Sequence, residues 1–269
     1  MIVTDRQVEA WLREDIGHHD VTNDVPGATT GRLVATESGV VAGIEAAVAI
    51  FEYLGVEVIE RTEPGERIEV GDAVLAVEGP ARSVLRGERT AVNVAGHASG
   101  VATRTRAAVG AARAESESVR IAATRKTTPG LRGVEKRAVA AAGGDTHRLD
   151  LSHMVMVKDN HVAEMGLEGA IESFARKASV ATKIEVEVED PEKARRAAEA
   201  GADIVLLDNM TPGEVREGVE AIPEGVLAEA SGGIAVGDVP AYAATGVDVI
   251  SMGALTHSAP ALDYSFRTG

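Results

Sequence analysis

A regular alternation of strand-like and helix-like segments, beginning near residue 119, constrains the fold more than any other feature of this sequence. Six short apolar runs have the composition of strands that are buried on both faces. They are Val119–Thr124, Met154–Val157, Ile184–Val188, Asp203–Leu207, Val226–Ala230 and Val247–Met252. Repeated units of one strand and one helix form a parallel sheet, which is either open and doubly wound or closed into a barrel.

The segments between these strands carry recognisable helix starts. Asp190 offers an N-cap in front of Pro191, and Thr211 with Glu214 three residues later matches a capping box. Glycines stand where the helices should end, at Gly143-Gly144, Gly201 and Gly246. The boundaries of the predicted βα units therefore rest on helix signals as well as on the strand pattern.

The N-terminal part lacks this alternation and is predicted to be a small α+β module followed by a connecting helix. A first helix begins after Thr4, which has Gln7 at capping-box spacing. The later elements are a strand within Gly31–Gly43, a helix over Ile44–Leu54, strands over Val56–Arg61, Ala73–Val77 and Ala81–Leu85, and a helix over Glu88–Arg113. We predict two domains, 1–113 and 114–269, with the active site in the second.

Composition excludes several classes of function. The chain has 27 basic and 42 acidic residues, a formal charge of -15, which disfavours a nucleic-acid-binding protein and a polybasic membrane surface. It has no cysteine, which excludes disulfides, cysteine metal sites and thiol nucleophiles. No signal-peptide core precedes the first helix and no apolar run is long enough to span a membrane, so we expect a cytoplasmic protein.

Positive charge is concentrated in one part of the chain. Between Arg86 and His161 thirteen Arg or Lys residues stand against seven Asp or Glu, a local balance of +6. Crowded cations repel one another, by about 4 kcal/mol for two charges about 4 Å apart at an effective dielectric near 20. Salt bridges to nearby carboxylates are one explanation, and a bound polyanion is the other.

Polar residues and glycines follow the predicted strands at the point where each ends. In chain order these are Thr124-Arg125-Lys126, Lys158, Glu187, Asp208, Ser231-Gly232-Gly233 and Gly253. Because parallel strands place their carboxyl ends on one face, we expect these residues to converge on one pocket.

Cationic side chains dominate this predicted pocket. Its candidate anion-binding residues are Arg125, Lys126, His147, Arg148 and Lys158. Three more cations, Arg132, Lys136 and Arg137, are interpreted as a solvated helix face. His97 is expected to be a core or interface histidine, and His161 and His257 to lie at the rim.

Glycine turns and carboxylates complete the prediction. Ser231-Gly232-Gly233 and Gly253 let backbone N–H groups approach a phosphate. Glu187 and Asp208 are candidate Mg²⁺ ligands, directly or through waters, because that ion prefers one or two carboxylates together with phosphates. The alternative is that these carboxylates pair internally with Lys126 and Lys158.

Specific motifs cover nearly the whole chain. They are EDIGHHDVT at 14–22, GERTAVNVAGHASGVATRT at 87–105, TRKTTPGLRGVEKRAV at 124–139, GGDTHRLDLSHMVMVKDNH at 143–161, EVEVED at 185–190, LLDNM at 206–210, SGGI at 231–234 and GVDVISMGALTHS at 246–258. In these motifs the chain resembles the quinolinate phosphoribosyltransferases. It departs from them at His18-His19, where the family usually has a glycine near the second position, in a region that is structural.

The resemblance implies an N-terminal α+β sandwich domain and a C-terminal parallel α/β barrel, TIM-like but irregular or open. It also implies a homodimer in which Arg89 reaches into the partner's site. Together with that arginine, Arg125, His147, Arg148 and Lys158 would hold the two carboxylates of quinolinate. The residues implied to face phosphoribosyl pyrophosphate and its Mg²⁺ are Lys126, Lys158, Glu187, Asp208, Ser231, Gly232, Gly233 and Gly253, and the catalytic residues among them are Lys126, Lys158, Glu187 and Asp208. Thr124 is a further candidate substrate-binding residue.

The implied activity is phosphoribosyl transfer to quinolinate followed by decarboxylation, which gives nicotinate mononucleotide, pyrophosphate and CO₂ in NAD biosynthesis. The alternatives are a related transferase acting on another small acid and a barrel lyase with Lys158 as Schiff-base nucleophile. A small-molecule sensor is a third, although no output domain is recognisable.

Overall fold

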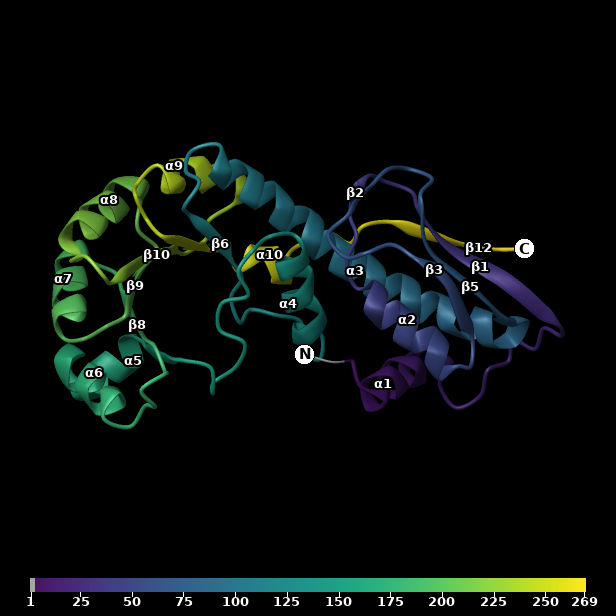
Figure 1. The fold of residues 1–269 in the computed structure, drawn as a ribbon. Coiled ribbons are helices and arrows are strands. Elements are labelled where there is room, and N and C mark those ends of the chain that lie inside the picture. The colour runs from purple at the N-terminus through teal and green to yellow at the C-terminus, as the bar shows by residue number, and fades with distance from the viewer. Residues whose placement is uncertain (1–2) are drawn as a thin grey trace. The chain divides into compact units, whose positions relative to one another are not determined.

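The computed structural model describes residues 3–269, which form two compact units (Figure 1). Unit 1 contains the chain up to Arg106 together with 128–143 and 258–269, and unit 2 contains 107–127 and 144–257. Both units are therefore discontinuous in sequence, whereas the predicted domains meet at a single boundary after residue 113. The difference arises because two later segments, around α4 (Arg132–Ala141) and β12 (Tyr264–Thr268), pack with the N-terminal residues.

Unit 1 is built on a four-stranded antiparallel sheet in the order β12-β1-β5-β3. Besides β12, this sheet contains β1 (Ala28–Ala35), β3 (Glu57–Arg61) and β5 (Ala73–Pro80). Leu33 in the middle of β1 pairs with Leu75 on one side and with Phe266 on the other. A short ladder joins β2 (Gly39–Val40) to β4 (Arg67–Ile68).

The helices of unit 1 confirm most of the sequence predictions. They begin with α1 (Asp5–Ile16) and α2 (Ile44–Tyr53). The Thr4 side chain caps α1 by accepting from the Gln7 amide at 3.4 Å. The Gln7 side chain instead donates to the Gly130 carbonyl at 3.1 Å. The N-cap was therefore correctly predicted, and the reciprocal half of the box is replaced by a tertiary contact.

The prediction of a strand over Ala81–Leu85 is wrong, because this segment is helical. The long helix α3 (Ala81–Arg113) begins directly after Pro80 ends β5. Ala81 and Val84 are buried on its inner face, so helical periodicity determines this segment. Within α3, a Cβ at Gly100 would lie 1.9 Å from the Pro260 carbonyl oxygen, so this glycine permits the close approach of the segment before β12.

The predicted solvated cation face on α4 was also wrong. Lys136 is fully buried, and Arg137 is largely buried with its Nε 2.6 Å from Glu45 Oε1. Next to Lys136, the buried Glu135 accepts from the Thr128 amide at 3.1 Å and lies 2.8 Å from His97 Nε2. His97 is therefore a core histidine, as expected. This burial could not be recognised in the sequence, because Glu45, the partner of Arg137, is distant along the chain.

Unit 2 contains the predicted parallel sheet. Its six strands are β6 (Arg120–Ala122), β7 (Val155–Val157), β8 (Ile184–Val188), β9 (Ile204–Asp208), β10 (Leu227–Ser231) and β11 (Val249–Ser251). The order is β6-β11-β10-β9-β8-β7, with every ladder parallel. Within the described residues no ladder closes β6 onto β7, so the strands follow a barrel's order in an open sheet. Each predicted strand is present: β8 has the predicted bounds, β9 and β10 are shifted by one residue, and β6, β7 and β11 are shorter than predicted.

The helices of unit 2 lie along the outside of this curved sheet (Figure 1). They are α5 (Asp159–Met165), α6 (Leu167–Ala175), α7 (Pro191–Glu199), α8 (Pro212–Ala221), α9 (Val239–Ala243) and α10 (Ala254–His257), with a 3₁₀ turn at Val236–Asp238. Asp190 caps α7, and Thr211 and Glu214 form the predicted box at α8.

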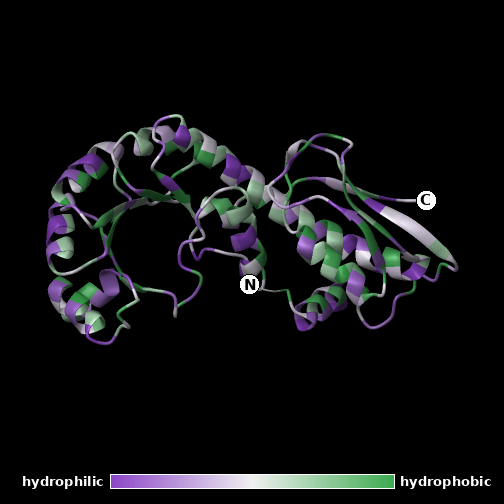
Figure 2. Ribbon diagram, in the orientation of Figure 1, coloured by the Kyte–Doolittle hydropathy of each residue, from purple (hydrophilic) through white to green (hydrophobic). Residues whose placement is uncertain are grey.

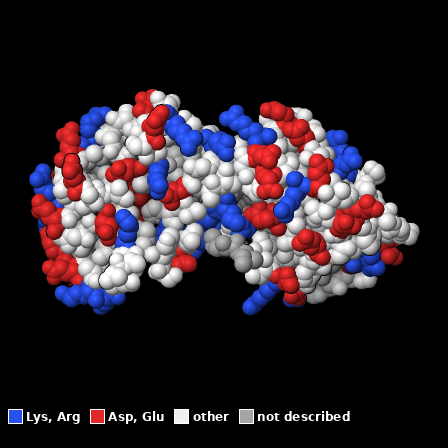
Figure 3. All heavy atoms as spheres, viewed as in Figure 1, with Lys and Arg blue, Asp and Glu red and all other residues white. Residues whose placement is uncertain are grey.

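Apolar side chains from the strands and the inner helix faces form the core of unit 2. Val157, Val186, Val205, Leu207 and Ile250 are completely buried. Hydrophobic residues gather along the sheet in Figure 2, while the outer helices alternate hydrophilic and hydrophobic faces. On the face shown in Figure 3, acidic side chains are scattered over both units, in keeping with the formal charge of -15. No helix in the described part of the chain is long and apolar enough to cross a membrane.

Candidate active site

The carboxyl ends of the parallel strands surround one cavity of about 330 Å³ in unit 2. Its lining residues are Thr124, Arg125, Lys126, His147, Arg148, Met156, Lys158, Glu187, Leu206, Asp208, Glu229, Ser231 and Ser251. Nine of the predicted site residues are among them, contributed by β6 to β10 and the loops that follow. The convergence expected from strand topology is present within a single compact unit.

The backbone of the loop after β6 is held in place by two threonine side chains. The Lys126 amide donates to Thr124 Oγ1 at 3.0 Å, and the Lys126 carbonyl accepts from Thr256 Oγ1 at 2.6 Å. Gly253 lies against the Lys126 side chain, where a Cβ would be 2.9 Å from Cδ. This glycine therefore leaves room for the lysine, a role that adds to its predicted one at a phosphate turn.

Lys158 directly follows β7 and forms an ion pair with Glu187, which lies near the end of the neighbouring β8. The Lys158 side chain is 43% exposed and that of Glu187 is 16% exposed, so the pair lies at the boundary between protein and cavity. The Lys158 amide also donates to His161 Nδ1 at 2.9 Å, at the start of α5. The predicted alternative of internal pairing is thus real for Glu187, and His161 acts as a helix-capping residue.

Asp208 ends β9 with its carboxylate fixed by its neighbour. Asn209 adopts a left-handed backbone with φ 56°, and its Nδ2 donates to Asp208 Oδ2 at 2.6 Å. Gly232 makes this turn possible, because a Cβ there would lie 2.5 Å from the Asn209 amide nitrogen. Burial raises the pKa of Asp208, and the negative charge of Glu187 raises it further. Two carboxylates that oppose each other's ionisation are suited to sharing a cation.

Two arginines supply strong anion-binding groups. Arg148 is 8% exposed, and its Nη2 contacts the sulfur of Met156 at 3.0 Å. Within the described residues, the buried Nε atoms of Arg148 and Arg125 have no hydrogen-bond partner. Burial and the charge of Arg125 lower the pKa of Arg148, whereas neighbouring glutamates oppose that shift. Buried guanidinium donors without acceptors in the protein indicate a site for a planar anion such as a carboxylate.

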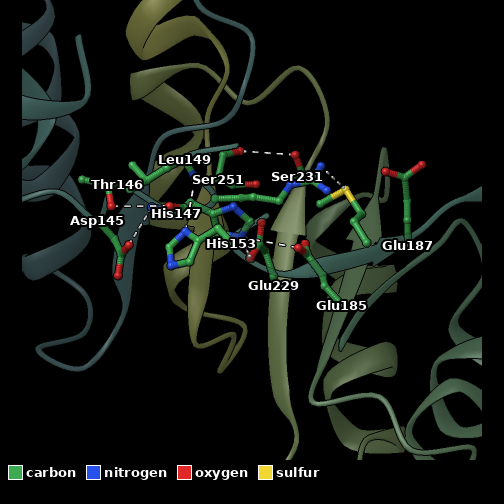
Figure 4. Close-up of polar contacts among 12 residues, drawn as sticks. Asp145, Thr146, His147, Leu149, His153, Glu185, Glu187, Glu229, Ser231 and Ser251 are labelled. Atoms are coloured by element: carbon green, nitrogen blue, oxygen red, sulfur yellow. Dashed lines mark hydrogen bonds and ion pairs between the residues drawn. The ribbon is translucent and has the colours of Figure 1, made fainter. Parts of the chain in front are cut away.

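Two glutamates that sequence reasoning missed lie beneath this layer. Glu185 and Glu229 are 0% and 1% exposed. Figure 4 shows them on β8 and β10, near the His147 ring. His147 Nε2 is 3.0 Å from Glu229 Oε2 and 3.6 Å from Glu185 Oε2. Strand alternation was the available signal, because Glu185 precedes Glu187 by two residues and therefore shares its face.

Four predicted residues do not line the cavity. Gly232, Gly233 and Gly253 occupy adjacent turns, with positive φ at the first two. Arg89 is an exposed residue of α3 in unit 1, with Nη2 3.8 Å from Glu88 Oε1. The role that the resemblance implies for it involves a second chain and stays a prediction.

Family models match both halves of the chain. Residues 20–99 match the N-terminal domain of quinolinate phosphoribosyl transferase, and residues 101–267 match its C-terminal domain. These matches confirm the resemblance noted in the sequence.

Curated relatives and solved structures agree with this result. The probable nicotinate-nucleotide pyrophosphorylase (carboxylating) of Methanothermobacter thermautotrophicus is 44% identical, over 97% of this chain and 97% of its own length. The human nicotinate-nucleotide pyrophosphorylase (carboxylating) is 42% identical, over 97% of this chain and 90% of its own. The crystal structure of NadC from Streptococcus pyogenes has a TM-score of 0.92 at 36% identity, covering 100% of this chain and 99% of that one. From its motifs, its fold and these matches, the chain belongs to the quinolinate phosphoribosyl transferase family.

Proposed function

We propose that this protein transfers the phosphoribosyl group of 5-phosphoribosyl 1-pyrophosphate to quinolinate and decarboxylates the product to nicotinate mononucleotide. One observation carries the proposal. Two arginines, whose buried Nε atoms have no hydrogen-bond partner among the described residues, share a cavity with two lysines and with the carboxylates of Glu187 and Asp208. The cationic side chains can bind both anionic substrates, and the two carboxylates can stabilise the positive charge that develops on the sugar.

The dicarboxylate substrate is assigned to the arginine side of the cavity. Arg125 and Arg148 offer planar forks that bind carboxylates in a bidentate manner, and His147 and Lys158 add donors beside them. We further propose that the protein is a cytoplasmic homodimer in which Arg89 of one chain completes the site of the other. An exposed arginine with one distant ionic contact is available for such a role.

Glu187 and Asp208 fit a magnesium ion by the chemistry of their donors. Both present oxygen ligands at the ends of adjacent strands, and burial, together with their mutual repulsion, raises the pKa of Asp208. Mg²⁺ bound there would supply charge neutralisation for the phosphates of the donor.

The side chains of this chain then have distinct tasks during the reaction. Glu187 and Asp208 stabilise the cationic C1 of ribose as pyrophosphate departs, and Lys126 and Lys158 bind the developing charge of the leaving group. The pyridine nitrogen attacks C1 and becomes cationic. The positive charge on that nitrogen stabilises the electron pair left on the neighbouring ring carbon when the carboxylate departs as CO₂, and a proton from water then takes the place of the carboxylate on that carbon, so transfer precedes decarboxylation.

The proposal is tested by incubating the protein with quinolinate, the phosphoribosyl donor and Mg²⁺ and measuring nicotinate mononucleotide by chromatography. Nicotinate in place of quinolinate should give no turnover, because the missing carboxylate leaves buried cations unpaired. Release of ¹³CO₂ from labelled quinolinate without the donor would overturn the order of steps. Trapping of a carbonyl substrate on Lys158 by borohydride would favour the lyase instead, which the Lys158–Glu187 ion pair does not favour.

A further inference from the structure

The buried glutamates beneath the cavity have no part in the mechanism above. Glu229 is on β10, two residues before Ser231, and Glu185 is on β8, two residues before Glu187. Burial of a charged carboxylate is costly unless it is paired. Neither oxygen of Glu185, and one oxygen of Glu229, has a hydrogen-bond partner among the described residues. Buried carboxylates of this kind are expected where they hold another group in place. The group that these two carboxylates contact is the imidazole of His147.

His147 is constrained from two sides. Its backbone has φ 49°, in the left-handed region that non-glycine residues rarely adopt, and its amide donates to Asp145 Oδ1 at 2.7 Å. Its ring nitrogen Nε2 lies 3.0 Å from Glu229 Oε2, with Glu185 behind at 3.6 Å (Figure 4). The backbone thus directs the side chain into the cavity, and the carboxylate fixes the ring.

We propose that Glu229 is a positioning residue of the active site, which accepts the Nε2 hydrogen of His147 and thereby orients the imidazole toward the quinolinate carboxylates. This inference rests on the proposed function. An imidazole has two distinct nitrogens, and a carboxylate that accepts from one of them determines which nitrogen carries the proton.

Glu185 strengthens this arrangement from the far side. Its carboxylate adds negative charge behind the imidazole without a competing hydrogen bond, so the ring is attracted inward while Glu229 sets its direction. The same three side chains have ligand atoms within 4.8 Å of one another, which also suits a divalent cation. Arg148 interacts electrostatically with both glutamates, so a cation is already present beside them. We therefore favour positioning over metal binding.

Three substitutions at Glu229 separate hydrogen bonding from charge. Glu229→Ala removes both, Glu229→Gln keeps an acceptor without the charge, and Glu229→Asp retracts the carboxylate. We expect Glu229→Ala to raise KM for quinolinate about 10–100-fold and to change KM for the phosphoribosyl donor less than about twofold. Glu229→Asp should restore part of the loss. The matched control is Glu135→Gln, which alters the other buried Glu–His pair, in unit 1, and should leave both KM values unchanged.

A spectroscopic measurement tests positioning without turnover. The ¹⁵N signals of the His147 ring, assigned with a His147→Gln variant, should move in Glu229→Ala and Glu229→Gln but stay in place in Glu135→Gln. Unchanged His147 signals in folded Glu229 variants, or equal rises in both KM values, would overturn the inference. Stoichiometric zinc or manganese lost in Glu229→Gln would also overturn it in favour of metal binding. Moved signals in a protein that makes no nicotinate mononucleotide would instead count against the proposed function.

Discussion

The two sheets of this chain use charge in opposite ways. In unit 1 the strands run antiparallel, so successive strands end at opposite edges and polar residues beyond them cannot gather. Charges packed within it form ion pairs inside the unit, as the partly buried Arg137 does with Glu45. In unit 2 the strands are parallel, and the residues after them meet around one cavity with buried donors left unpaired. Ion pairs within the unit therefore mark structure in unit 1, and charged groups gathered around a cavity mark the site in unit 2.

The largest expected effect comes from removing an unsatisfied charge. Arg148→Ala should lower kcat/KM for quinolinate about 10³-fold, since losing a buried charged donor to an anionic ligand costs about 2–5 kcal/mol. Arg137→Ala should leave kcat/KM within about threefold and cost about 1–2 kcal/mol of unfolding free energy. Steady-state kinetics and urea denaturation measure both. Similar kinetic losses in the two variants would break the distinction between the units.

Strand topology explains why so much of the cavity was predictable. Each repeated βα unit brings the end of its strand to the same edge of the sheet. The side chains of Lys158, Glu187 and Asp208, which stand at or near strand ends, could therefore be predicted to lie together from the sequence alone. Glu185 and Glu229 were missed because each lies two residues before the strand-end residue that was used for the prediction, so only the alternation of side chains along the strand indicated that they face the same way.

Long-range pairing accounts for the other failures. The Lys136 burial and the addition of β12 to the sheet of unit 1 depend on residues distant in sequence. Helix caps such as Thr211 were predicted correctly because both partners lie within one turn. Local and periodic features were thus readable, and contacts between remote segments were not.

Two glycines sharpen the comparison through stability. Gly100→Ala in unit 1 would place a Cβ 1.9 Å from the Pro260 carbonyl oxygen, a backbone atom that cannot easily move. We expect a loss of about 3 kcal/mol in unfolding free energy. Gly253→Ala in unit 2 meets the flexible Lys126 side chain at 2.9 Å. It should cost less than about 1 kcal/mol but lower kcat about tenfold by displacing the lysine. A reversed pattern in denaturation and kinetics would contradict this assignment.

Mixing two inactive variants tests whether unit 1 contributes to a neighbour's site. Arg89→Ala and Lys158→Ala homodimers should each be nearly inactive. Equal mixing gives half heterodimers with one intact site each, so about one quarter of the wild-type activity should return. Differently tagged chains and size-exclusion chromatography establish that heterodimers formed. No recovery in such heterodimers would confine the site to a single chain.

The smallest expected effect is a change in how stability depends on pH. Burial, reinforced by the charge of Glu229, raises the pKa of Glu185 above its ordinary value of 4.5. A carboxyl whose pKa is raised in the folded state binds its proton more tightly there than in the unfolded chain. Its contribution to stability is therefore lost as pH rises from the unfolded pKa through the folded one.

Glu185→Gln removes this titration, so its Tm should fall less steeply than that of the wild type between about pH 5 and pH 9. The total fall in Tm across that range should differ between the two proteins by several degrees, because one kcal/mol of unfolding free energy corresponds to about 2–4 °C in Tm for a chain of this size. Calorimetry in EDTA without substrates isolates the unliganded protein, and Glu217→Gln on the exposed face of α8 controls for loss of a surface charge. Parallel curves for wild type and Glu185→Gln would mean that Glu185 ionises normally. In that case unpaired charge would not be concentrated beneath the cavity, and the contrast between the two units would rest on the arginines alone.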